Sequence, residues 1–177
     1  MEKNLQYPIG RYTQPAVIDE PMLASAIEAI ELFPARLNEE VCRMTDDQLD
    51  TPYRPGGWTV RQLIHHCADS HMNSFIRLKL ALTEENPVIK PYKEERWAML
   101  ADSKLEIESS MKLLEALHFK WAFLLKALTY SEREKCYTHP ESGKEFDVAQ
   151  STLLYGWHCA HHLAHITELK NRNGWVN

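Results

Sequence analysis

Histidine is the residue type whose placement most suggests chemistry in this sequence. Nine histidines are present, and most of them fall in two short stretches, residues 65–71 and 158–165. The second stretch, Trp157-His158-Cys159-Ala160-His161-His162-Leu163-Ala164-His165, holds four histidines within eight positions. Imidazole nitrogens are ligands of zinc, nickel, copper and iron in proteins. The clustering therefore predicts a site for a divalent metal ion.

The spacing in the second stretch is typical of a helical metal-binding pair. At about 100° per residue, His158, His162 and His165 fall within about 60° of arc, and His161 lies about 40° further round. Histidines four positions apart can converge on one ion, and both His158 with His162 and His161 with His165 satisfy this condition. Two ligands leave the ion under-coordinated, so a third should come from another element.

The stretch 65–71 is the other dense source of imidazole, and we favour His66 within it. As a helix, this stretch places His66 on a polar stripe with Gln62, Ser70, Asn73 and Arg77. Such a stripe suits a cleft inside a bundle. His65 falls on a different side, and His71 falls within the apolar stripe, where we expect a core residue or one that supports a ligand. Three histidines with open coordination positions are typical of a catalytic metal.

Four segments combine helical periodicity with boundary signals. They are residues 20–44 after Asp19, 59–82 after the turn at 54–57, 103–128 with Ser103 as N-cap, and 147–172 with Asp147 and Gln150 as a capping box. Residues 130–147 predict a short hairpin that turns at 140–143. The sequence therefore predicts an all-α fold, a four-helix bundle with a short hairpin excursion before the last helix.

Composition limits the class of protein. A chain of 177 residues, 44% of them hydrophobic, with a net charge of −5, is expected to form a single domain over 1–177. The sequence contains neither a long apolar run nor a signal-peptide pattern, so we expect a cytoplasmic protein with no membrane partner. It contains no Lys/Arg cluster, which argues against a nucleic-acid partner and leaves a small molecule as the expected substrate. The four cysteines form no C-x-x-C pair and are expected to be reduced and mostly buried.

The chain resembles the DinB superfamily and, within it, the YfiT-like branch, whose members are described as metal-dependent hydrolases and as bacillithiol transferases. The resemblance covers nearly the whole length. It is carried by Tyr7 through Tyr12, Gly56 through Gln62, His65 through Asn73, Ile89 through Tyr92, His139 through Gly143, and Trp157 through Ile166. It implies a DinB-type four-helix bundle, one divalent ion per subunit, zinc or nickel, and a homodimer in the cytoplasm.

Carried over residue by residue, the resemblance implies a specific ligand set. The ligand of the second helix lies in a His-x-Ala-Asp pattern, which here gives His66, and the pair of the last helix falls on His158 and His162. Because the histidines occur as doublets, the ligands are easily misassigned by one position, and His65, His161 and His165 remain alternatives. The resemblance also implies a pocket or supporting role for His165.

Two reactions are compatible with such a site. A divalent ion on three histidines activates water for hydrolysis, and it also deprotonates a coordinated thiol, so hydrolysis and thiol transfer to an electrophile can share one centre. A low-molecular-weight thiol is therefore a candidate partner. The candidate catalytic residues are His165, as a proton shuttle, and Asp69, which lies one turn from His66 and could orient a ligand ring.

The expected pocket walls are two segments rich in aromatic and basic residues. They are the 84–102 loop, with Tyr92, Arg96 and Trp97, and the Arg11-Tyr12 segment. The same residue types also favour a dimer surface. Two further hypotheses are a non-catalytic metal-binding stress-response protein and a histidine-based pH switch without metal.

Overall fold

A computed structural model describes residues 5–175 of the chain. The ends of the predicted domain, residues 1–4 and 176–177, lie outside the described residues. The four long helices are α1 (Glu20–Val41), α3 (Val60–Thr83), α5 (Glu108–Ala127) and α7 (Val148–Asn173). The short elements are α2 (Asp46–Leu49), α4 (Glu94–Trp97), a 3-10 helix η1 (Ala101–Lys104), α6 (Tyr130–Arg133), β1 (Cys136–His139) and β2 (Lys144–Asp147). The predicted all-α class and the hairpin before the last helix are confirmed.

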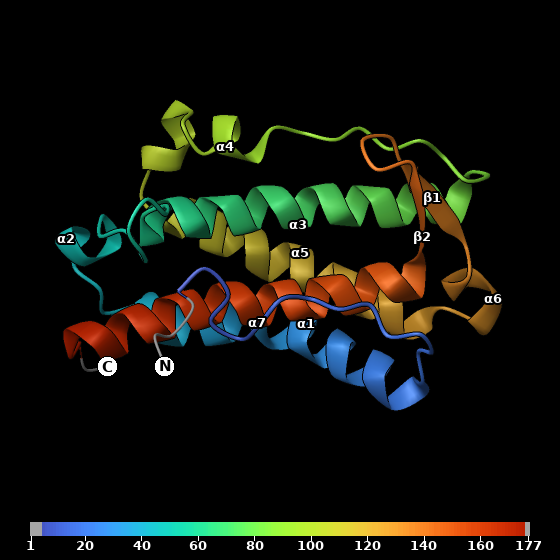
Figure 1. Ribbon diagram of the computed structural model, residues 1–177, viewed down its shortest axis with the longest axis horizontal. Helices are drawn as coiled ribbons and strands as arrows, with labels where there is room; N and C mark the ends of the chain where they lie inside the picture. Colours follow the sequence, from blue (N-terminus) through green and yellow to red (C-terminus); the bar gives the residue numbers. More distant parts are fainter. Residues whose placement is uncertain (1–4, 176–177) are drawn as a thin grey trace.

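The long helices form a four-helix bundle (Figure 1). Helix α1 packs against α5 and α7, and α3 packs against the same two helices. Helices α1 and α3 therefore lie at opposite corners of the bundle although they are consecutive long helices in the chain. Strands β1 and β2 pair antiparallel, with Cys136 opposite Asp147 and His139 opposite Lys144. The hairpin projects beside one end of α3 and leads directly into α7.

Side-chain caps fix where the two histidine-bearing helices begin. Thr59 accepts a hydrogen bond from the backbone N–H of Gln62, and the Gln62 side chain accepts from the N–H of Thr59, so α3 opens with a capping box. Asp147 and Gln150 form the same arrangement at the start of α7, as the sequence predicts. Gly174, with φ +65°, ends α7 in the left-handed conformation that glycine adopts without strain.

The prediction that Ser103 caps the third long helix is wrong. Ser103 lies within η1, where it is buried and its hydroxyl donates to the carbonyl of Trp97. Helix α5 begins five residues later, after Ile107, which provides no side-chain cap. A buried tertiary contact has therefore overridden a local capping signal. The 84–102 segment, expected as an ordered loop, contains the short helix α4 and the start of η1.

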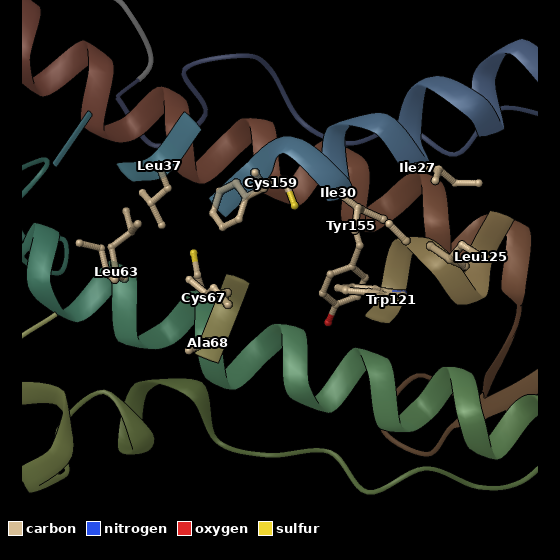
Figure 2. Packing of buried hydrophobic residues seen from close by; sticks show 14 of the residues in the cluster. Ile27, Ile30, Leu37, Leu63, Cys67, Ala68, Trp121, Leu125, Tyr155 and Cys159 are labelled. Atoms are coloured by element: carbon tan, nitrogen blue, oxygen red, sulfur yellow. The ribbon is translucent and has the colours of Figure 1, made fainter. Parts of the chain in front are cut away.

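The core is built from apolar side chains of all four long helices. Figure 2 shows Ile30 of α1, Leu63 and Cys67 of α3, Trp121 of α5 and Cys159 of α7 pointing into one interior. All four cysteines are free, and two of them, Cys67 and Cys159, are buried, so the expectation of mostly buried thiols holds for half of them. Among residues 5–175, no helix combines the length and apolar character that crossing a bilayer requires.

Candidate metal centre

Three histidines converge where α3 lies beside α7. One ring nitrogen from each of His66, His158 and His162 can be chosen so that all lie within 4.8 Å of one another. The Nε2 atoms of His158 and His162, one helical turn apart on α7, are separated by 3.1 Å. The His66 ring, from α3, has its centroid 5.0 Å from that of His162 and 5.7 Å from that of His158.

This spacing fits a shared metal ion. Bonds of about 2.0–2.1 Å from zinc to imidazole nitrogen, at tetrahedral or octahedral angles, place two ligand nitrogens about 3–3.4 Å apart. The separation of 3.1 Å between the Nε2 atoms of His158 and His162 lies within that range. The three rings supply nitrogen donors only and come from two helices, so the remaining coordination positions are open to a substrate or water.

Burial keeps these rings neutral, which is the form that binds metal. Burial lowers the pKa of His66 to about 4. It lowers the pKa values of His158 and His162 well below the usual range as well, and the neighbouring imidazoles add to both shifts. The cluster therefore has free nitrogen lone pairs at neutral pH in the folded protein, without competition from protons.

The alternative ligands of the two doublets lie elsewhere. The Nδ1 atom of His65 is 2.7 Å from the hydroxyl of Ser110, and its Nε2 is 3.0 Å from the carbonyl oxygen of Leu105, so this ring is used in packing α3 to the α5 region. His161 and His165 pair with each other through Nε2 atoms 3.1 Å apart, and the His161 ring has its centroid 5.2 Å from that of His162. The structure thus brings together the three rings favoured in the sequence and leaves the three alternatives outside their cluster.

Comparison with known proteins identifies the family of this chain. Residues 29–166 match the model of the DinB superfamily. This chain belongs to the DinB superfamily. A Bacillus cereus protein named "Putative metal-dependent hydrolase" is 52% identical over 172 residues, covering 97% of this chain and 99% of its own. A Bacillus mycoides protein of the same designation is 51% identical over 173 residues, covering 98% and 99% of the two chains.

A solved structure shows the same fold. YfiT from Bacillus subtilis, described as "a probable metal-dependent hydrolase with an unusual four-helix bundle topology", superposes with a TM-score of 0.95 at 49% identity. The match covers 98% of this chain and 99% of YfiT.

The two candidate catalytic residues of this DinB-superfamily chain occupy different settings. Asp69 is half-buried, and burial, with a smaller effect of Asp102, raises the pKa of its carboxyl to about 6. Among the described residues, no hydrogen bond joins this carboxyl to the three rings. His165 packs on the ring of Tyr53, with centroids 4.1 Å apart, and lies 6.1 Å from the His162 ring. The predicted role of Asp69 in orienting a ligand ring is therefore not supported by a hydrogen bond among the described residues, and His165 is engaged in packing.

A cavity of about 430 Å³ opens beside His158. Besides His158 it is lined by Ser70, Arg77, Glu94, Tyr137, His139, Glu141, Ser142, Phe146, Leu154 and Tyr155. Its walls mix aromatic surface with hydroxyl, guanidinium and carboxyl groups, as ligand pockets do. A larger cavity of about 600 Å³ lies between α1 and α5, but no histidine lines it. The smaller cavity is the one in contact with the cluster.

The expected pocket walls are only partly correct. The 84–102 segment contributes Glu94 to this cavity, while Tyr92 and Trp97 pack on each other with ring centroids 4.6 Å apart. The Arg11-Tyr12 segment instead lies against other aromatic rings, with Tyr12 5.9 Å from Trp157. The hairpin residue His139 and the α7 residue Tyr155 were not predicted as pocket residues. His139 lies in a stretch that carries the family resemblance, but nothing in the sequence places that stretch beside α7.

Proposed function

We propose that this chain is a metal-dependent hydrolase in which His66, His158 and His162 bind one divalent ion, zinc or nickel. The observation that carries the proposal is the meeting of three imidazole nitrogens from two helices within 4.8 Å, with His66 and His162 buried and His158 partly buried. The relatives' designation as metal-dependent hydrolases supports it. A divalent ion supplies Lewis acidity at such a site, which activates water and polarises a carbonyl group.

The chain's own residues would bind and orient the substrate. His158 reaches the cavity of about 430 Å³, so a molecule bound there lies against one ligand of the centre. The hydroxyl groups of Tyr155 and Ser70, 3.3 Å apart, line the same cavity and can hydrogen-bond a substrate oxygen. Asp69, one helical turn from His66, stays a candidate for orienting a ligand ring, and burial raises the pKa of its carboxyl to about 6.

Thiol transfer, the second reaction expected from the resemblance, stays a prediction. The same three nitrogens could hold a thiolate, since coordination deprotonates a thiol. Neither the cavity nor the relatives' names favours this reaction over hydrolysis. The assay that separates the two compares the zinc- or nickel-loaded protein on ester and amide substrates with its action on bacillithiol plus an electrophilic acceptor.

The ligand assignment predicts the effect of single substitutions. His66→Ala, His158→Ala and His162→Ala should each weaken metal binding by at least about 100-fold, because changes to residues that only support ligands already cost about 10–100-fold. Metal content after gel filtration, measured by mass spectrometry, and turnover should fall together while helicity by circular dichroism is retained.

The doublets provide matched controls. His65→Ala and His161→Ala alter the neighbouring histidine on the same helix, and both variants should keep their metal. Loss of metal in either control with retention in His66→Ala or His162→Ala would place the site on the other member of the doublet. If chelation lowers the melting temperature while neither reaction responds to metal, the catalytic proposal is wrong and a stabilising role for the ion replaces it.

A further inference from the structure

A row of three imidazoles crosses the core and ends at His158. The Nδ1 atom of His158, on α7, lies 3.0 Å from Nε2 of His71, on α3. The Nδ1 atom of His71 lies 2.8 Å from Nε2 of His118, on α5. The Nδ1 atom of His118 in turn contacts the carbonyl oxygen of Ile30, on α1. Each long helix of the bundle therefore contributes one member to a single row of hydrogen bonds.

A proline makes the last acceptor available. In a regular helix the carbonyl of Ile30 would accept from the backbone N–H four residues later, but that position is Pro34, which has no N–H. Ile30 and Pro34 are both buried in α1, so water does not replace the missing donor. His118 fills this position from the neighbouring helix, which satisfies a backbone group that would otherwise be an unpaired acceptor in the core.

The chemistry of the groups fixes the direction of the whole row. A carbonyl oxygen only accepts, so the Nδ1 of His118 must carry the proton. His71 and His118 are both 0% exposed, and among their described contacts none is with a carboxylate, so burial favours the neutral imidazole. A neutral imidazole with a proton on Nδ1 has a bare Nε2, which accepts from the next ring. The same argument applies to His71, whose Nδ1–H donates to Nε2 of His118, and then to His158, whose Nδ1–H donates to Nε2 of His71.

The consequence for His158 is that its Nε2 carries a lone pair. This is the atom that lies 3.1 Å from Nε2 of His162, inside the three-histidine cluster. We propose that His71 and His118 are positioning residues, which hold His158 as its Nδ1–H tautomer and so direct its Nε2 at the metal ion. The proposal rests on the ligand assignment of the proposed function.

The two ligands on α7 differ in this respect. His158 is anchored through His71 and His118, whereas the buried Nδ1 of His162 has no hydrogen-bond partner among the described residues. An isolated core histidine needs one acceptor and one donor to be satisfied. The row from the carbonyl of Ile30 to His158 does more than satisfy buried polar groups, because it orients the ligand ring that borders the cavity.

The first test reads the tautomers directly in the wild-type protein. Long-range ¹H–¹⁵N correlation spectra of histidine-labelled, metal-free protein at pH 7.5 should show His71, His118 and His158 as Nδ1–H tautomers. Assignment uses His71→Gln and His118→Gln. A proton on Nε2 of His71 or His118 in the wild-type protein would overturn the proposal. Because no metal is added, this measurement does not depend on the proposed activity.

The second test measures metal affinity in matched variants. His118→Leu removes both hydrogen bonds and should weaken zinc binding by about tenfold or more, measured by competition with a chromophoric chelator. His118→Gln keeps a donor for Ile30 and an acceptor for His71, and it should restore most of the affinity. Phe33→Leu is the packing control, because Phe33 contacts the rings of His71 and His118 without hydrogen-bonding to them. It should lower the melting temperature and leave zinc affinity unchanged.

The outcomes separate this inference from the proposed function. Wild-type protein that binds no divalent ion overturns both. Wild-type protein that binds zinc, together with a folded His118→Leu variant of equal affinity, overturns the positioning role alone. Equal losses of affinity in His118→Leu, His118→Gln and Phe33→Leu would also overturn it, since core packing would then explain the effect.

Discussion

His65 and His66 are neighbours in the sequence and occupy different environments in α3. His66 faces α7 and the three-ring cluster, whereas His65 faces Ser110 and the carbonyl of Leu105. Successive residues of a helix are rotated by about 100°, so only one member of a doublet can face a given neighbour. The same reasoning separates His162 from His161, whose ring stacks on that of Trp157 at 4.5 Å.

The buried His118 predicts how stability depends on pH. Burial lowers its pKa from 6.5 to about 4. Between these two values the unfolded chain binds a proton that the folded protein does not, so the free energy of unfolding falls as pH drops from 6.5 to 4. One such group contributes a slope of about 1.4 kcal/mol per pH unit. Urea unfolding of the metal-free protein between pH 7.5 and 4.5 measures this slope.

The control for this effect is His118→Gln, which has no titrating group at that position. Its free energy of unfolding should fall less steeply over the same pH range. The slope should differ from that of the wild type by about 1.4 kcal/mol per pH unit, the contribution of one titrating group. Identical slopes for the wild type and the variant would show that His118 is protonated in the folded protein. The remaining slope comes from other buried histidines, including His66, whose pKa is also lowered to about 4.

Helix starts are the best-defined local features of this chain. Helices α2, α3 and α6 all open with a threonine in a capping box, and α7 opens with Asp147 in the same role. These caps fix where a helix begins, and the helix period then fixes which residues share a face. Thr59 and Asp147 therefore help to set how far along the bundle axis His66 and the His158/His162 pair lie.

Thr59→Ala should destabilise the protein by about 1 kcal/mol, because it removes the acceptor for the N–H of Gln62 at the start of α3. Thr45→Ala is the matched control, since Thr45 makes the same capping box on the four-residue helix α2. Thr45→Ala should lower the global free energy of unfolding by less than Thr59→Ala does, because a short surface helix can fray without unfolding the bundle. Urea denaturation measures both. A larger loss in Thr45→Ala would contradict the expectation.

At the level of the whole bundle, α1 and α7 approach very closely at Gly156. A Cβ added there would lie 2.9 Å from both the Cα and the Cβ of Ala26. Both helices carry members of the imidazole row, Ile30 on α1 and His158 on α7, so this close packing also sets the distance that the row must span. The homodimer implied by the resemblance stays a prediction.

Gly156→Ala should therefore destabilise the protein by about 1–3 kcal/mol, as overpacking of a core does. Helix propensity alone would favour alanine by about 1 kcal/mol, so the sign of the change separates the two effects. Ala160→Gly, at an exposed position of the same helix, reports the propensity effect alone and should cost about 1 kcal/mol. Thermal or urea unfolding measures both variants. A stabilised Gly156→Ala protein would show that α1 and α7 are not in tight contact.

The amino-acid sequence by itself determined the four long helices, the caps Asp19 and Asp147 of the first and last of them, and the hairpin before the last helix. These features follow from local rules: apolar residues at intervals of three and four, capping boxes and turn residues. It also identified the two histidine-rich stretches and favoured His66, His158 and His162, because four-residue spacing is visible in one segment. The Ser103 cap failed, since a buried contact with Trp97 outweighs a local signal there.

Only the tertiary structure decided how the helices are rotated against one another and which side chains meet. The contact of His71 with His118 joins residues 47 positions apart, and the contact of His118 with Ile30 joins residues 88 apart. Such pairings leave no periodic trace, because each histidine looks like an isolated polar residue in an apolar stripe and Ile30 takes part only through its backbone carbonyl. The cavity beside His158 likewise combines α3, α7 and the hairpin. Long-range packing, and not local propensity, sets the surroundings of the candidate metal centre.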